Sequence, residues 1–179
     1  MTTPPDFRPF PKIPRFDREV IITEKIDGTN ASVHVTDEGD VFAGSRNRWL
    51  TLDQDNFGFA RWVHEHETEL RDGLGPGTHF GEWWGLGIQR GYDLHERRFS
   101  LFNTSRWAET PPPSCCHVVP VILTTKGCYL TTDVPDALTD LKSSGSYAAA
   151  GYMNPEGVVL YHVAARQLFK VTFDDGPKG

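Results

Sequence analysis

The chain has 179 residues, of which 38% are hydrophobic and 23% are charged. This balance is typical of one globular domain and excludes a disordered tail protein. Its 18 basic and 24 acidic residues give a net charge of −6, which excludes a protein that coats long nucleic acids by charge alone. Any contact with nucleic acid is therefore expected to be local, through a basic patch such as Arg46 with Arg48 or Arg97 with Arg98.

The sequence predicts a cytosolic protein without a membrane contact. No apolar run approaches the ~20 residues that span a membrane, and the N-terminal residues lack the apolar core of a secretory signal. Three cysteines, an odd number, do not make a disulfide framework. We interpret Cys115, Cys116 and Cys128 as reduced structural thiols rather than zinc ligands with His117, because adjacent thiols rarely bind one tetrahedral ion.

The first elements in chain order are an extended segment and a hairpin. Residues 1–16 contain five prolines and predict an extended, non-helical lead-in. Residues 20–22 are a short apolar run typical of a buried strand. Apolar and polar residues then alternate over 31–36, and after an acidic turn at 37–40 the apolar run 41–43 returns, which predicts a hairpin.

A helix follows, and then two strands. Apolar residues at helical spacing predict a helix from a cap at Asn56 to about Arg71. Strands are expected at 78–84 and 98–103, separated by a glycine-rich segment at 85–91.

The second half of the chain completes the pattern of strands and helices. The expected elements are a strand at 118–123 with an irregularity at Pro120, a helix from Asp133 to about Lys142 closed by Gly145, and strands at 158–163 and 168–173. The sum is an α+β fold with mostly antiparallel sheets and a few flanking helices. We expect a single domain over residues 1–179, with 1–16 as its lead-in and no second domain after it.

Four short segments carry charged side chains in apolar or glycine-rich surroundings: 24–30, 80–85, 155–159 and 168–172. Taken singly, each is typical of a turn or strand edge with solvated charges. A lysine beside a turn glycine, such as Lys25 near Gly28, acts as a nucleophile only in a desolvated or cation-rich pocket. Together the segments place two lysines and four carboxylates on elements able to converge, which suits a site for a polyphosphate and Mg²⁺.

In their order along the chain, these segments resemble the motifs of covalent nucleotidyltransferases, and among them those of ATP-dependent RNA ligases of phages and of RNA repair and editing. The matching segments are 25–30, 44–48, 80–85 with its continuation to 89, 99–103, 156–159 and 168–172. The resemblance spans about residues 11 to 174. Thr29, Asn30 and the Gly-Ile-Gln tail at 87–89 favour the RNA-ligase branch over DNA ligases and capping enzymes.

The resemblance implies the ATP-grasp-like nucleotidyltransferase domain of covalent ligases, with Lys25 as the catalytic nucleophile. It also implies that Arg46 and Asn30 hold ribose and phosphate, and that Phe102 stacks on adenine. The implied ATP-binding residues are Glu24, Lys25, Ile26, Asn30, Arg46, Glu82, Phe102, Glu156 and Lys170. The implied ligands of Mg²⁺ or Mn²⁺, bound through water, are Asp27, Glu82 and Glu156.

The implied function is an ATP-dependent RNA ligase that joins RNA 5′-phosphate and 3′-hydroxyl ends through a covalent lysyl-AMP intermediate. The implied setting is the cytoplasm of a bacterium or of a phage-infected cell. Thr172 stands where the family often has a second lysine, and only nine residues follow Lys170, whereas better-known members have a further domain there. A partner chain that supplies the grip on RNA is therefore one expectation.

Two alternatives remain at this point. One is a DNA-nick ligase or a capping-type nucleotidyltransferase, which would use the same lysine. The other is a nucleotide-binding or RNA-binding module that has lost catalysis. Thr172, in place of the family's second lysine, is the observation that suggests it.

Overall fold

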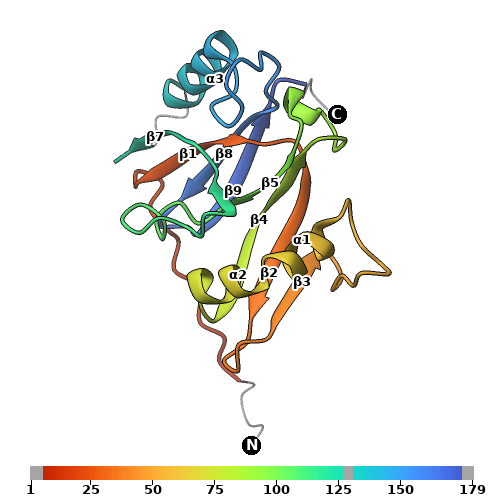
Figure 1. Ribbon diagram of the computed structural model, residues 1–179. Coiled ribbons are helices and arrows are strands. Elements are labelled where there is room, and N and C mark those ends of the chain that lie inside the picture. Colours follow the sequence, from red (N-terminus) through yellow and green to blue (C-terminus); the bar gives the residue numbers. More distant parts are fainter. Residues whose placement is uncertain (1–5, 127–130, 175–179) are drawn as a thin grey trace, which may run out of the picture.

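In the computed structural model, which describes residues 6–126 and 131–174, two β-sheets and three α-helices form the domain (Figure 1). Sheet A has the strand order β7-β1-β8-β9, with the bounds Val121–Thr125, Val20–Lys25, Gly157–His162 and Gln167–Thr172. Sheet B has the order β3-β2-β4-β5-β6, with the bounds Val41–Ser45, Thr29–Val35, Gly77–Gly85, Arg97–Leu101 and Cys116–Val118. Strand pairs in both sheets are antiparallel except β5 with β6. The predicted α+β fold is confirmed.

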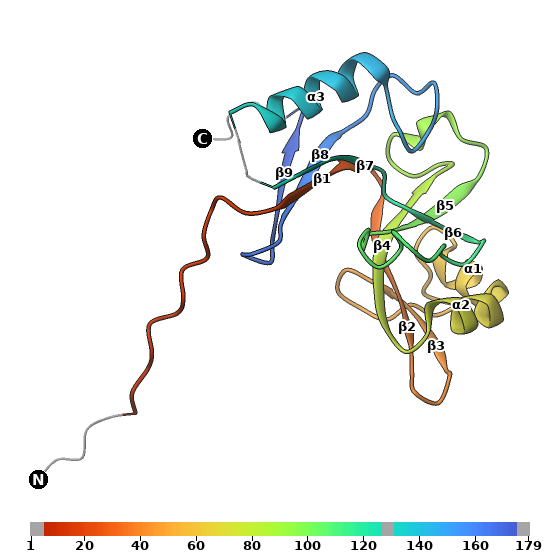
Figure 2. The same cartoon turned by 90° about the vertical axis from the view of Figure 1, so that its left-hand side faces the viewer.

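Each sheet is covered by helices on one face (Figure 2). The helix α3, Asp133–Ser144, lies over sheet A, where Leu141 packs in one core cluster with Ile22 and Leu160. The helices α1, Phe59–Glu65, and α2, Glu67–Leu74, cover sheet B. Because side chains alternate along a strand, the residues between those of the core point to the opposite, helix-free faces.

The core under α1 and α2 is mainly aromatic. The ring of Phe59 lies between those of Trp83 and Phe99, with centroid distances of 5.3 and 5.1 Å. All three side chains are at least 98% buried. This cluster packs β4 and β5 against α1; β4 carries Glu82 on its other face, and Phe102 directly follows β5.

The helix predicted from Asn56 to Arg71 is in fact two helices that meet at His66. The capping carboxylate is that of Asp55, which accepts hydrogen bonds from the backbone N–H of Ala60 at 2.7 Å and of Arg61 at 3.3 Å. The Asn56 side chain instead donates to the Thr29 hydroxyl, 3.1 Å away. Asp and Asn are equally good caps in sequence, so the neighbouring Asp was as good a candidate.

The strand predicted at 118–123 is divided between the two sheets. Val118 ends β6 in sheet B, and Val121 begins β7 in sheet A. Pro120 lies at the crossing, where it has no N–H for a ladder, and its carbonyl accepts a hydrogen bond from Glu24 N at 3.0 Å. The irregularity predicted at this proline is thus a change of sheet.

The helix predicted from Asp133 is confirmed, with Gly145 as its C-cap at φ +79°. Residues 6–15 of the predicted lead-in contain no helix or strand and are exposed. No helix in the described part of the chain is long and apolar enough to cross a membrane. Cys115 and Cys116 are free thiols, and Cys128 lies outside the described residues.

Replacement of Leu141 tests the core under α3. The side chain is fully buried, so we expect Leu141→Ala to lower the free energy of unfolding by about 2–5 kcal/mol. Its exposed neighbour provides the control, since Lys142→Ala should change this energy by less than about 0.5 kcal/mol. Urea unfolding followed by circular dichroism measures both, and similar values for the two variants would contradict the assigned core.

Candidate active site

The end of β1 meets the start of β8, and this junction forms the centre of the site. Lys25, the last residue of β1, lies opposite Gly157, the first residue of β8. The Nζ atom of Lys25 donates a hydrogen bond to Glu156 Oε2 at 2.5 Å and forms an ion pair with it. The two side chains are 21% and 16% exposed, so the pair is largely withdrawn from solvent but still reachable.

Gly157 is required by the close approach of three strands. It lies opposite both Lys25 and Thr172, and its φ is +151°. A Cβ atom at this position would lie 2.2 Å from the carbonyl oxygen of Val171. Lys25 and Thr172 therefore lie on the same face of sheet A with no side chain between them.

Glu82 holds the turn that connects the two sheets. Its Oε1 accepts a hydrogen bond from the backbone N–H of Gly28 at 3.1 Å, and its Oε2 accepts one from Asn30 Nδ2 at 3.3 Å. Gly28 fits against β4 because it has no side chain, since a Cβ atom would lie 2.5 Å from the carbonyl oxygen of Trp83. The turn is thus held in place by the hydrogen bonds to the Glu82 side chain and by the close contact of Gly28 with the backbone of β4.

The charges of Glu82, Lys25 and Glu156 act on one another. The pKa of Glu82 is raised to about 7, mainly by burial and to a smaller extent by the negative charge of Glu156. The hydrogen bonds from Asn30 and Gly28 and the positive charge of Lys25 oppose this rise. Glu82 is 8% exposed. The three groups, which we call the Lys25–Glu82–Glu156 cluster, are therefore brought together as the sequence predicted.

Glu24 points away from this cluster, into the interior. It is 1% exposed, and its carboxylate accepts hydrogen bonds from the Ser146 hydroxyl and the backbone N–H groups of Tyr147 and Ala148, at 2.7, 2.8 and 2.9 Å. Burial raises the pKa of Glu24 against the opposing effect of these bonds. The carboxylate thus anchors the 146–148 loop, and the ATP contact implied for this residue stays a prediction.

Asp27 lies beside the cluster in an ion pair that sequence reasoning missed. Its carboxylate accepts a hydrogen bond from Arg90 Nε at 2.9 Å. Arg90 also donates to the carbonyl of Asn154 at 3.2 Å and forms an ion pair with Asp174. The backbone N–H of Asp27 donates to the hydroxyl of Tyr92 at 2.8 Å. The sequence feature that could have pointed to Arg90 is its position directly after Gln89, the end of the motif-like segment 80–89.

The other predicted ATP-binding residues are spread over both sheets. Lys170 is exposed on β9 opposite Val159, and therefore lies on the same face of sheet A as Lys25. Phe102, 40% exposed, donates its backbone N–H to Phe80 and thereby lies on the Glu82 face of sheet B.

Ile26 and Arg46 have opposite environments. Ile26 is 4% exposed and belongs to a core cluster with Trp84 and Tyr92. Arg46 is exposed and makes no hydrogen bond or ion pair with the residues that the structure describes. The guanidinium of Arg46 is thus available to an anionic ligand. The side chain of Ile26 packs in the core, so only its main chain could contact a nucleotide.

The arrangement of carboxylates sets a limit on metal binding. Within residues 6–126 and 131–174, no three His, Cys, Asp or Glu side chains are grouped closely enough to hold a metal ion. Metal binding by Asp27, Glu82 and Glu156 through water, as the motifs imply, therefore stays a prediction.

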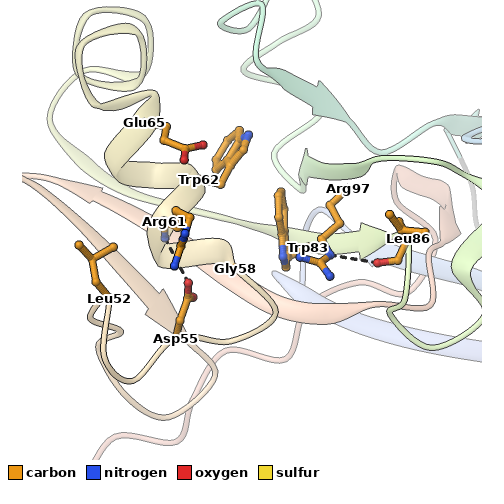
Figure 3. Close-up of a pocket in the computed structure, with 9 residues that line it drawn as sticks. All are labelled: Leu52, Asp55, Gly58, Arg61, Trp62, Glu65, Trp83, Leu86 and Arg97. Atoms are coloured by element: carbon orange, nitrogen blue, oxygen red, sulfur yellow. Dashed lines mark hydrogen bonds between the residues drawn. The ribbon is translucent and has the colours of Figure 1, made fainter.

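A separate pocket of about 660 Å³ lies on the opposite face of sheet B (Figure 3). Trp62 and Arg61 of α1 line it, together with Trp83 and Arg97. Trp83 alternates with Glu82 along β4, so this pocket faces the helices and is distinct from the Lys25–Glu82–Glu156 cluster.

A family model described as RNA ligase matches residues 18–172, most of the chain. The chain belongs to the RNA ligase family. The resemblance inferred from the motifs is thereby confirmed. No curated protein matches the chain in sequence.

Solved structures of Naegleria gruberi RNA ligase share the fold of this RNA ligase family member. A mutant without ligand gives a TM-score of 0.61 at 18% identity, over 87% of this chain and 50% of that one. A mutant with ATP and Mn gives 0.62 at 17% identity, over 87% and 49%. A third, with AMP and Mn, gives 0.60 at 18% identity, over 88% and 50%. The chain thus spans about half the length of these ligases.

The raised pKa of Glu82 predicts how the stability of the metal-free chain depends on pH. The pKa is about 7 in the folded chain against an ordinary value of 4.5, so the folded state binds this proton more tightly. The contribution to the free energy of unfolding is complete below about pH 4.5 and is lost as the pH rises through about 7. We expect a loss of roughly 3 kcal/mol across this window.

Urea unfolding at pH 5 and pH 8 in a chelating buffer measures this loss. The variant Glu82→Gln should lack it, and Glu38→Gln, at an exposed position, should retain it. The same pH dependence in Glu82→Gln and in the unchanged chain would show that another group is responsible.

Proposed function

We propose that this chain is an ATP-dependent RNA ligase domain in which Lys25 becomes covalently linked to AMP. The observation that carries the proposal is the placement of Lys25 Nζ 2.5 Å from Glu156 Oε2, with Glu82 within electrostatic reach. These groups belong to the segments that resemble the family's motifs, and all three lie within the matched region, residues 18–172. The structures of Naegleria gruberi RNA ligase with ATP and Mn, and with AMP and Mn, support the same choice of nucleotide and metal.

The first step is an in-line displacement at the α-phosphorus of ATP. A bond forms between Lys25 Nζ and phosphorus, the bond to the bridging oxygen breaks, and pyrophosphate leaves with the electron pair. Nζ must lose a proton to attack, and Glu156 Oε2 at 2.5 Å is placed to accept it. Reactions of this type are accelerated mainly by positioning and by neutralisation of charge.

The surrounding residues position the nucleotide. Lys170 shares the face of Lys25 and supplies a cation for the phosphates, as does the unpaired guanidinium of Arg46. Phe102 offers a partly exposed ring for adenine, and Asn30, fixed by Glu82, faces the same side for the ribose. Thr172 has a hydroxyl where many relatives have a second lysine, so Lys170 carries this task on β9 alone.

The metal ion fits this site through water. Glu156, which pairs with Lys25, and Glu82, which interacts electrostatically with both, would hold Mg²⁺ or Mn²⁺ by water-mediated contacts. Asp27 would first have to leave its ion pair with Arg90. When bound, the ion supplies positive charge that neutralises the phosphate oxygens.

The later steps transfer AMP to an RNA 5′-phosphate, after which an RNA 3′-hydroxyl displaces AMP and seals the ends. The substrates are therefore RNA ends, and we include in the proposal a partner chain that contributes further contacts with RNA. The motifs that resemble those of phage and repair ligases support a cytoplasmic role in a bacterium or a phage-infected cell.

Intact-mass measurement after incubation with ATP and Mg²⁺ tests the proposal. The chain should gain the mass of one AMP, and acid should remove it because the link is a phosphoramidate. Lys25→Ala should gain nothing, whereas Lys12→Ala, in the exposed lead-in, should react normally. An AMP adduct on Lys25→Ala would overturn the assignment, and absence of an adduct on the unchanged chain would favour a binding module.

Glu156→Gln should slow formation of the adduct on the order of 100-fold, because the amide keeps the shape but cannot accept the proton or hold hydrated metal. Glu82→Ala should also lose most of the rate. It removes the acceptor of two hydrogen bonds as well, so its fold must be checked by circular dichroism. The exposed Glu19→Gln serves as the control. Normal rates at saturating Mg²⁺ in Glu156→Gln would contradict its role.

Sealing should be weaker and more sensitive to salt than formation of lysyl-AMP. Adduct formation needs only the nucleotide pocket, whereas sealing needs two RNA ends held in line by a chain of net charge −6. Joining of a nicked RNA duplex at about 50 and 150 mM salt, with a DNA duplex in parallel, measures this. Sealing that keeps pace with adduct formation at both concentrations would contradict the expectation, and preferred DNA joining would identify a DNA ligase.

A further inference from the structure

We propose that the exposed rings of Phe42, Trp49 and Phe80 form a stacking surface for RNA bases that extends from the Lys25–Glu82–Glu156 cluster. We call these three residues the aromatic surface. The inference rests on the proposed function, since it assigns where the RNA beside a reacting end lies. It uses the helix-free face of sheet B, which carries Glu82 and Asn30.

The strand register places the aromatic surface directly beyond Glu82. Glu82 lies opposite Asn30 on β2. Two residues further along, Phe80 lies opposite Ser32, and after two more, Phe42 lies opposite His34. Residues at such positions share one face, and at 3.4 Å per residue the two aromatic rows lie about 7 and 14 Å from the Asn30 row. The aromatic surface thus extends along β2 from the position of Glu82 towards the β2–β3 turn.

Trp49 joins this face through Gly44. The backbone forms a bridge between Trp49 and Gly44, and a Cβ atom at Gly44 would lie 3.4 Å from the indole ring. The indole centroid is 6.0 Å from that of Phe42 and 5.8 Å from that of His34. The indole ring therefore lies over Gly44, on the same face as Phe42.

The exposure of these rings is the main reason to assign them a ligand. Phe42, Trp49 and Phe80 are 48%, 58% and 62% exposed, on a strand face that no helix covers. Grouped apolar rings in contact with water are costly and mark binding surfaces. Nucleobases have flat π faces and stack on such rings with little regard to sequence.

The charge around the surface favours RNA over a protein partner. Arg46 and Arg48 lie between β3 and Trp49, both exposed, and Arg48 makes one hydrogen bond, to the carbonyl of Gln54 at 2.9 Å. No acidic residue occurs from 41 to 52. The acidic turn at 37–40 bounds the surface at its far end. In contrast, Arg97 donates to the carbonyls of Leu86 and Phe57, so its guanidinium is engaged within the fold.

Binding of a fluorescently labelled single-stranded RNA 12-mer, measured by anisotropy at low salt, tests the inference without requiring catalysis. The probe variants are Trp49→Tyr, which keeps an aromatic ring, and Trp49→Leu, which keeps apolar area without one. The double variant Phe42→Ala/Trp49→Ala removes both rings. Phe10→Ala, 82% exposed in the lead-in, is the matched control.

We expect Trp49→Leu to weaken RNA binding about tenfold and the double variant to weaken it further, whereas Trp49→Tyr and Phe10→Ala stay within about twofold. The AMP adduct should form at the normal rate in all of them. Equal binding by Trp49→Leu and Trp49→Tyr, unchanged binding by the double variant, or no RNA binding by the unchanged chain would overturn the inference. Slower adduct formation in the double variant would also overturn it, because the surface would then serve ATP.

These outcomes separate the inference from the function on which it rests. Absence of an AMP adduct on the unchanged chain with normal, ring-dependent RNA binding would contradict the ligase proposal but leave the aromatic surface as an RNA site. A normal adduct with RNA binding that does not depend on the rings would support the ligase proposal but contradict the aromatic surface as an RNA site. It would favour a protein partner on this face.

Discussion

The chain leaves sheet A at Lys25 and enters sheet B at Thr29, so the residues between them determine how the two sheets meet. Glu82 receives hydrogen bonds from Gly28 and Asn30, and Gly28 lies too close to the backbone of β4 to carry a side chain. A buried carboxylate costs free energy unless donors satisfy it. Here the donors belong to the turn and the start of β2, directly after Lys25, so the hydrogen bonds that satisfy Glu82 also hold the segment that follows Lys25.

Alternation along β1 gives two neighbouring charged residues different tasks. Glu24 faces the core and anchors the 146–148 loop, whereas Lys25 faces the site and meets Glu156. The loop leads to the segment that carries Glu156, so the inward carboxylate also supports the partner of the outward lysine. A strand one residue out of register would exchange the two faces and lose both contacts.

The sequence predicted the fold class correctly, whereas the roles assigned to the site residues stay predictions. Of the predicted site residues, Lys25 and Glu156 form an ion pair, and Glu82 lies close enough to interact electrostatically with both. Periodicity did not reveal the break at His66 or the change of sheet at Pro120, because tertiary contacts decide both. The side-chain orientation of Glu24 and the contacts of Arg90 depend on partners more than 60 residues away, which no local pattern contains.

The ion pair between Lys25 and Glu156 joins residues separated by 131 positions. During synthesis from the N-terminus, Lys25 and all of β2 to β5 are made long before Glu156, and a contact of such long range forms late in folding. A nascent or truncated chain would therefore contain Lys25 without its carboxylate partner. The order of the residues along the chain thus delays assembly of the complete lysine site until nearly the whole domain has been made.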